Sequence, residues 1–231
     1  MANTALQCES CPVRDRAACS ALQPDERGQL AEIGRHRTVR RGETVFAAGD
    51  DSAWCATLIS GALKIASYDN EGTERILSLV HPAGFVGELF APMAQHDIVA
   101  LADSRLCIFS RNQYSAAVER FPALARALLR RSGEELFESR ALIDLMGRRS
   151  SIGRVAGLIL ALGRAASHSP CDVAQSFDLP LTRGEMAGLL GITIETVSRR
   201  LTELVQRGII KKNGARGLEI LDAPSLEGLV R

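Results

Sequence analysis

Residues 182–201, TRGEMAGLLGITIETVSRRL, decide how the C-terminal part of the chain folds. Thr182 can cap a first short helix and Thr193 a second one. Ala187 is small enough for the two helices to approach closely, and Gly191 can adopt the positive φ that the turn between them needs. The stretch therefore predicts a helix-turn-helix, the motif that places its second helix in the major groove of DNA.

The second helix presents three polar side chains of different hydrogen-bonding type on one face. Glu195, Ser198 and Arg199 fall at positions i, i+3 and i+4, opposite an apolar stripe. Glutamate accepts from a cytosine amino group, arginine binds guanine through two hydrogen bonds, and serine adapts to either. The alternative is an exposed ion pair between Glu195 and Arg199. We favour base recognition because the helix follows the turn.

The basic residues of this region are crowded together, although the net charge of the whole chain is only +1. Binding through the entire surface would need a larger excess, since it scales with the number of phosphates neutralised. Residues 209–221, IIKKNGARGLEIL, place two apolar runs around an Asn-Gly turn and so predict a hairpin. The sequence thus predicts a winged helix-turn-helix with a local DNA footprint. Beside the triplet above, its candidate DNA contacts are Thr193, Arg183 and Arg200.

Length and composition indicate a soluble chain with room for two domains. It has 231 residues, of which 46% are hydrophobic and 24% charged. No apolar run is long enough to cross a bilayer, and residues 1–22 lack the apolar core of a secretion signal. We expect a cytoplasmic protein without a membrane partner. Six cysteines are few for a disulfide scaffold, so ligands, redox groups or core thiols are expected.

Three of the cysteines lie on a short polar segment near the N-terminus. Cys8 and Cys11 have the spacing with which two sulfurs share one metal centre, and Cys19 follows eight residues later. Little in this segment is apolar enough to bury free thiols. Metal ligation is therefore favoured over incidental thiols. Zinc and a cubane iron-sulfur cluster each need a fourth ligand, which must come from a distant part of the chain.

From Thr38 to about Phe109, short apolar or alternating runs are separated by glycine turns. This pattern is typical of an antiparallel barrel or roll. The runs are residues 44–46, 58–59, 62–65, 75–80, 98–101 and 106–109.

A long helix is predicted from about Pro122 to Arg148. Residues Leu129, Leu136 and Ile143 recur every seven positions, and Ser132, Ser139 and Met146 follow each by three. The stripe can pack on the roll of the same chain or pair with a second copy. We favour a homodimer, because helix-turn-helix proteins usually bind as twofold dimers with half-sites roughly 34 Å apart.

The order of these parts predicts an α+β chain with four sections. They are a cysteine-rich arm at 1–21, a β-roll sensor domain at 22–118, a dimerisation helix at 119–148 and a winged helix-turn-helix domain at 149–231. This order resembles the CRP/FNR family of bacterial transcription factors over essentially the whole chain. The arm and the Glu195, Ser198 and Arg199 triplet are similar to the FNR branch, the oxygen-responsive regulators of anaerobic metabolism.

The resemblance implies a roll like that of cyclic-nucleotide-binding domains and a homodimer on a TTGAT-N4-ATCAA-like palindrome. In the FNR branch the matching Glu, Ser and Arg bind the half-site, and RNA polymerase is a partner. The family's fourth cluster cysteine lies on a late strand of the roll, where this chain has Cys107. The resemblance therefore implies a [4Fe-4S] cluster on Cys8, Cys11, Cys19 and Cys107.

In the family such a cluster promotes pairing and DNA binding at low oxygen, and oxygen destroys it and releases the DNA. The arm departs from the best-known members in its longer second gap, Cys-x7-Cys. The family's acidic residue that opposes pairing of cluster-free chains falls on Glu138 or Ser139, and only Glu138 can play that part. A zinc-stapled regulator and a thiol-disulfide switch are the alternative interpretations.

The remaining candidates are given structural or incidental roles. Cys55 is expected to be a buried thiol and Cys171 an incidental one. Nucleotide-binding relatives follow Gly-Glu-Leu, here 87–89, with an Arg and a Ser or Thr, whereas this chain has HDIVA at 96–100. Without a guanidinium for the phosphate, no cyclic nucleotide is expected.

Two other kinds of protein are disfavoured by the sequence. An axial haem ligand is not indicated, because the histidines, His36, His81, His96 and His168, are isolated from one another. No nucleophile and base at catalytic spacing, phosphate-binding loop or carboxylate pair indicates an enzyme, so no catalytic residue is expected.

Overall fold

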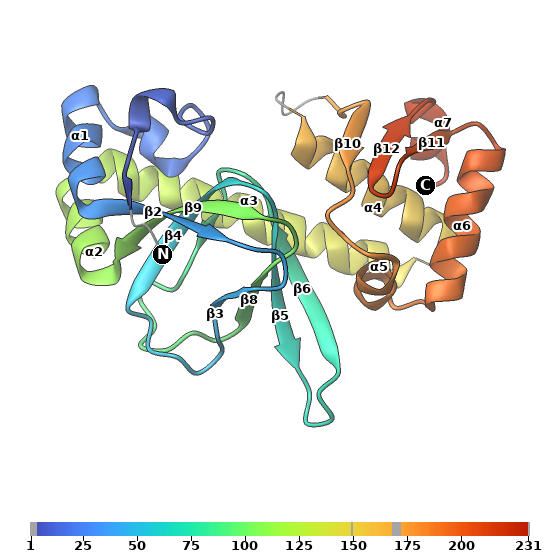
Figure 1. Ribbon diagram of the computed structural model, residues 1–231, viewed down its shortest axis with the longest axis horizontal. Coiled ribbons are helices and arrows are strands. Elements are labelled where there is room, and N and C mark those ends of the chain that lie inside the picture. Colours follow the sequence, from blue (N-terminus) through green and yellow to red (C-terminus); the bar gives the residue numbers. More distant parts are fainter. Residues whose placement is uncertain (1–3, 149, 168–171, 231) are drawn as a thin grey trace. The chain divides into compact units, whose positions relative to one another are not determined.

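The structure is a computed structural model that describes residues 4–148, 150–167 and 172–230. The chain divides into two compact units, Met1–Glu138 and Ser139–Arg231. The division falls inside the long helix α3 (Pro122–Gly147), which the repeat of apolar residues predicted almost to the residue (Figure 1). The four sections expected from the sequence are finer than this division and stay a prediction. Cys171 and His168 lie outside the described residues.

The first unit is built around two antiparallel sheets, which confirm the predicted roll (Figure 1). Buried aliphatic side chains such as Leu58, Leu63 and Leu106 fill the space between them. The first sheet has the order β1 (Thr4–Ala5), β2 (Gly34–Val39), β9 (Ser104–Ser110), β4 (Trp54–Ser60) and β7 (Phe85–Val86). The second has the order β3 (Thr44–Phe46), β8 (Asp97–Ala100), β5 (Leu63–Tyr68) and β6 (Glu74–Val80).

Strand β9 contributes to two cores because its side chains alternate between the faces of the sheet. Leu106 points into the roll, whereas Cys107 and Phe109 point out of it. The outward face packs against helices α1 (Pro24–Ile33), α2 (Arg111–Arg120) and the start of α3. The arm adds two short 3-10 helices, η1 (Cys8–Ser10) and η2 (Ala18–Ala21), on the same side of the roll (Figure 1).

Helix α1 was not foreseen, because its apolar stripe is weak and only Leu30 is buried. The helix begins with a capping box in which the Glu26 carboxylate accepts from the Gln23 amide at 2.9 Å. Pro24 occupies the first helical position, where its missing N–H costs nothing.

The second unit contains the end of α3 and a winged helix-turn-helix. Its helices are α4 (Ser151–Ala166), α5 (Arg183–Leu190), α6 (Ile194–Gln206) and α7 (Ala223–Gly228). Strands β10 (Ser176–Asp178), β12 (Gly217–Ile220) and β11 (Ile210–Asn213) form one antiparallel sheet in that order. The predicted hairpin is confirmed with one difference: Asn213 pairs with Gly217, so the loop has three residues and Gly214, at φ 69°, opens it.

The predicted turn between the two helices is also confirmed. The Thr182 hydroxyl accepts from the Glu185 amide at 3.2 Å, and the Glu185 carboxylate accepts from the Thr182 amide at 2.7 Å. Gly191 adopts φ 61° and ends α5, and Thr193 caps α6 by accepting from the Thr196 amide at 3.2 Å. These local bonds fix where each helix begins and ends.

We predict that Gly191→Ala destabilises the second unit by about 1–2 kcal/mol, because an alanine side chain is strained in the left-handed region. Urea unfolding followed by circular dichroism measures the change. Gly188→Ala is the matched control: Gly188 lies inside α5, and an added Cβ would meet nothing within 4 Å. This control should gain roughly 0.5–1 kcal/mol. Equal losses in both variants would contradict the assignment of the turn.

Candidate metal centre and DNA-binding surface

One row of side chains across the first sheet forms the floor of a pocket in the first unit. Cys107 on β9 is paired with His36 on β2 and with Thr57 on β4. Cross-strand partners project from the same face of a sheet, so all three side chains line the pocket. The register of the sheet thus fixes the place of Cys107.

The cysteine arm covers this floor. Cys8, Cys11 and Cys19 line the same pocket as Cys107, in a cavity of about 570 Å³ that includes space open to solvent. The arm is less polar in its packing than the sequence suggested. Val13 and Ala17 are 2% and 1% exposed and belong to a small core that also contacts Cys11, Cys19 and Cys107. The structure therefore brings together the four cysteines that were proposed as ligands.

Arg27 on α1 holds the arm in place through its backbone. Its Nε donates to the Cys19 carbonyl at 3.2 Å and its Nη2 to the Leu22 carbonyl at 3.0 Å. The guanidinium also lines the pocket, and its charge acts to lower the pKa values of Cys8 and Cys19. Arg27 therefore contributes both to the shape of the site and to the stability of thiolates within it.

Burial dominates the ionisation of the thiols when no metal is bound. It raises the pKa of Cys8, raises that of Cys19 to about 11, and raises that of Cys107 further, and the neighbouring thiols add to each shift. These three thiols are therefore protonated at neutral pH. A metal or cluster that binds them as thiolates must displace protons and would stabilise the folded arm.

The donor set of four thiols fits a sulfur-ligated metal centre. Zinc binds four sulfurs tetrahedrally with Zn–S bonds of about 2.3 Å, and iron-sulfur clusters are held by four cysteine thiolates. The four thiols line one shared cavity, and either kind of centre takes such a donor set.

Two pocket residues were missed by reasoning from the sequence. His36 was considered isolated, yet its ring lines the pocket, its Nε2 accepts from the Gln7 amide at 3.4 Å, and its buried Nδ1 has no described partner. Arg27 carried no sequence signal at all. Strand pairing and an unforeseen helix bring them to the site. Cys55 is fully buried, as expected, and does not line the pocket.

The predicted base-contacting face lies on α6. Glu195 and Arg199 are exposed and Ser198 is half-buried, while Val197 and Leu201 are buried on the opposite side. No ion pair within 4 Å joins Glu195 to Arg199 in the described part of the chain, although the backbone amide of Glu195, the Thr193 hydroxyl and, least, Arg199 lower the pKa of the Glu195 carboxyl. Both side chains are therefore available to a ligand.

Arg183 extends this surface from the start of α5. Its Nη1 donates to the Ser198 hydroxyl at 3.2 Å. Burial lowers the pKa of Lys212 on the wing, the hairpin of β11 and β12, and the charge of Arg183 lowers it further. The N-terminus of α5, the middle of α6 and the wing thus form one basic surface.

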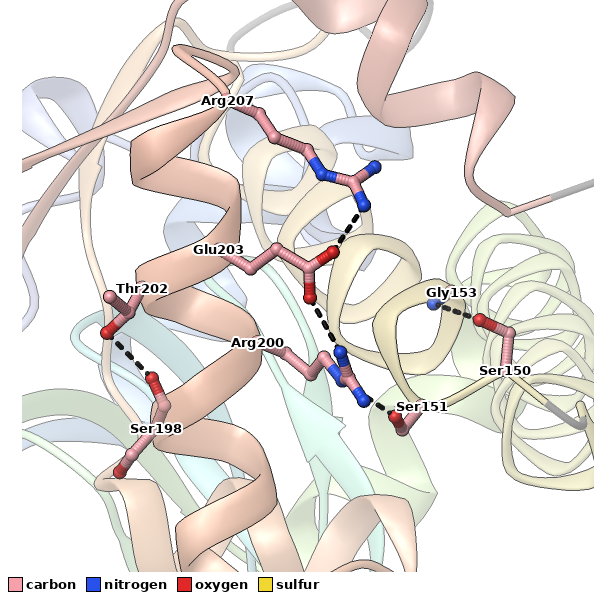
Figure 2. A network of polar contacts seen from close by, with 8 residues as sticks. All are labelled: Ser150, Ser151, Gly153, Ser198, Arg200, Thr202, Glu203 and Arg207. Atoms are coloured by element: carbon pink, nitrogen blue, oxygen red, sulfur yellow. Dashed lines mark hydrogen bonds and ion pairs between the residues drawn. The ribbon is translucent and has the colours of Figure 1, made fainter.

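Arg200 is placed differently from the other predicted DNA contacts (Figure 2). Its Nε donates to the Ser151 hydroxyl at 2.9 Å and its Nη1 to the Glu203 carboxylate at 2.6 Å. Glu203 also pairs with Arg207. Arg200 therefore ties α6 to the first residue of α4, and its contact with DNA stays a prediction.

The end of α3 is fastened to the same unit by Arg154 on α4. Its Nε donates to the Arg148 carbonyl at 2.7 Å and its Nη1 to the Leu190 carbonyl at 3.0 Å. Leu145 is buried against Gly157, where an added Cβ would lie 2.4 Å from the leucine Cδ1. The Arg154 guanidinium thus joins the residue that follows α3 to the end of α5, just before the turn that leads to α6.

A stripe of apolar side chains on α3 is exposed. Leu129, Leu136 and Ile143 have 75%, 50% and 64% of their surface exposed, and Met146 is half-buried. Glu138 lies about 200° around the helix from Leu136, whereas Ser139 follows Leu136 by three residues and lies beside the stripe. Burial raises the pKa of Glu138. Its part in opposing pairing stays a prediction, and its position on α3 weakens it.

A roll followed by a long helix and a winged helix-turn-helix is the architecture of a DNA-binding transcription regulator. Residues 36–121 match the cyclic nucleotide-binding domain, and residues 153–229 match the Crp-like helix-turn-helix domain. The chain belongs to the CRP/FNR family of transcription regulators, which are not enzymes.

Similar proteins include FNR-type activators. The chain is 31% identical to the transcriptional activator protein FnrL of Cereibacter sphaeroides over 94% of its length and 88% of that protein. It is 33% identical to a probable transcriptional activator of Rhizobium leguminosarum over 98% and 94% of the two chains. The structure of FixK2 from Bradyrhizobium japonicum has a TM-score of 0.77 at 24% identity, covering 86% of this chain and 98% of that one, and shows the shared fold.

The match to the cyclic nucleotide-binding domain does not test whether a nucleotide binds. Between Gly87 and Ala100 the chain has no arginine or lysine, and Glu88 accepts from the Gln95 amide at 3.0 Å. The absence of a cyclic nucleotide therefore stays an expectation. Within the described ranges, no helix is both long and apolar enough to cross a membrane.

We predict that iodoacetamide modifies Cys8 and Cys11 well before Cys55 in the native, metal-free protein. Burial raises the pKa of Cys55 to about 12 and leaves none of its surface exposed, so little thiolate is present and the reagent cannot reach it. Mass spectrometry of timed samples at pH 8 should find Cys55 at least about tenfold slower. Equal rates in native protein would contradict this burial, and urea-unfolded protein, in which the rates should converge, is the control.

Proposed function

We propose that the chain is a cytoplasmic, oxygen-responsive transcription regulator whose DNA binding depends on a [4Fe-4S] cluster. The observation that carries the proposal is the convergence of four thiols on one pocket, three from the arm and Cys107 from β9. The similarity to FNR-type activators supports it. Cys8, Cys11, Cys19 and Cys107 would be the ligands.

The residues around the pocket have distinct tasks in this proposal. A bound [4Fe-4S] cluster supplies an oxygen-labile link between the arm and β9. Arg27 holds the arm carbonyls and favours thiolates, and Val13 and Ala17 keep water from the inner side of the loop. Thr57 and His36 flank Cys107 on the floor.

Pairing of two chains through α3 is the second part of the proposal. Exposed Leu129, Leu136 and Ile143 form an apolar stripe that a second copy would cover, with Met146 at its end. A twofold dimer would present two α6 helices to the half-sites of a TTGAT-N4-ATCAA-like palindrome. In each half-site Glu195, Ser198 and Arg199 would contact bases, with Arg183 and Thr193 beside them. Contact with RNA polymerase follows from the family resemblance.

Purification without air tests the cluster directly. We predict a brown protein with about four iron and four sulfide per chain, whose absorbance bleaches in air while palindrome binding is lost. Cys107→Ser should lower iron and sulfide and abolish the air-sensitive binding, whereas Cys55→Ser should change neither. A colourless wild type that holds zinc, or one whose air response is a disulfide between arm cysteines, would overturn the proposal in favour of those chemistries.

We predict that Arg199→Ala weakens binding to the palindrome by about 10- to 100-fold, because a lost bidentate guanine contact costs about 1–3 kcal/mol. Fluorescence anisotropy with matched and scrambled duplexes measures it. Arg216→Ala on the wing is the control and should weaken binding to both duplexes alike, with a shallower salt dependence. If both variants lost specific and nonspecific binding equally, base recognition by Arg199 would be excluded.

A further inference from the structure

We propose that Arg131 is the positioning residue through which the cysteine arm controls helix α3. The inference rests on the proposed function, since it concerns how the state of the arm reaches the helix that pairs. The contact on which it depends joins two segments of the first unit that are 115 residues apart in sequence.

The contact is a hydrogen bond from a side chain of α3 to the backbone of the arm. Arg131 Nη2 donates to the Arg16 carbonyl at 2.5 Å. Its Nη1 donates to the Glu134 carboxylate one turn further along α3, at 3.1 Å. The guanidinium is therefore shared between the arm and the helix, with only 22% of the side chain exposed.

Arg131 stands where the apolar packing of α3 on its own unit ends. Leu124 and Ala127 are buried in the core shared with α1 and α2, and Arg131 follows Ala127 by four residues on the same face. The exposed Leu129 lies about 200° around the helix. Ala18 of the arm is buried in the same core, and one turn beyond that core the arm contacts α3 through the hydrogen bond of Arg131.

The acceptor is a carbonyl whose position depends on the conformation of the loop. Arg16 lies between Cys11 and Cys19, and its amide donates to the Val13 carbonyl within the same loop. When these two thiols are held, the carbonyl is fixed beneath the guanidinium. When they are released and the loop rearranges, Arg131 loses this acceptor and keeps only the Glu134 carboxylate, with which it already pairs at 3.1 Å.

Coupling of this kind is reciprocal, because two equilibria that share a contact bias each other equally. Arm ordering that favours pairing of α3 implies that pairing of α3 favours arm ordering. Removal of the guanidinium should therefore leave both events possible but weaken the coupling between them. A residue that only stabilised the fold would not change how strongly arm ordering and pairing of α3 depend on each other, so the coupling distinguishes a positioning role from a stabilising one.

The test compares Arg131→Ala with Arg130→Ala. Arg130 is the matched control: it is the neighbouring arginine, its side chain is 67% exposed, and it pairs with the same Glu134 at 3.7 Å. Sedimentation gives the dimer dissociation constant of the full chain with and without its iron and sulfide. We expect R131A to keep its iron and sulfide. The ratio of its dimer dissociation constant without iron and sulfide to that with them should be at least about tenfold smaller than in the wild type, whereas R130A should match the wild type.

Amide hydrogen exchange supplies a readout that needs no cluster. In metal-free protein the amides of residues 14–20 should exchange faster in R131A than in the wild type, and in R130A they should not. If R131A holds less iron than R130A, the dissociation constants of the two variants are compared at matched iron content, and the same thresholds decide.

The outcomes separate this inference from the proposed function. A wild-type protein without iron and sulfide ends the proposed function, and exchange then still decides whether Arg131 orders the arm. A wild type that assembles its cluster and pairs normally, beside an R131A variant with an unchanged ratio of constants and unchanged exchange, overturns the role of Arg131 alone.

Discussion

The alternation of side chains between the two faces of β9 is the constraint on which the first unit depends. The Leu106 side chain is buried inside the roll. Because successive side chains of a strand lie on opposite faces, the Cys107 side chain must point outward. The outward face would expose a thiol and several aromatic side chains if it were left bare. Helices α1 and α2 and the arm cover it, and the Tyr114 ring of α2 packs at a tilt on the Phe109 ring of β9, with the ring centroids 4.9 Å apart. The pocket lined by the four cysteines therefore lies on the outer surface of the roll and not inside it.

This placement separates two uses of one fold. The inside of the roll is filled with aliphatic side chains, and the loop after Gly87 offers no cation to a phosphate. The outside holds the thiols of Cys19 and Cys107 at a depth where burial raises their pKa values and keeps them protonated at neutral pH. Arg27 and Arg131 donate to backbone carbonyls of the arm, so guanidinium groups help to hold the arm beside its own short backbone turns.

The parts predicted from the sequence are those with local causes. Three local features depend on residues close in sequence, and the structure agrees with each. They are the caps at Thr182 and Thr193, the turn at Gly191 and the seven-residue spacing of apolar side chains along α3. Helix α1 escaped because a single buried leucine leaves no periodic stripe. The neighbourhood of Cys107 and His36 depends on strand register, and the tie from Arg200 to Ser151 on tertiary packing, so neither could follow from spacing alone.

The two compact units meet inside α3 at Glu138 and Ser139, without a loop between them. A continuous helix turns by about 100° for each residue. Adding or removing a single residue there would therefore move Ile143 and Met146 around the helix axis and out of line with Leu129 and Leu136, and only a change of about seven residues, close to two full turns, nearly restores the original phase. The apolar stripe of α3 thus depends on the number of residues between its members as well as on their hydrophobicity.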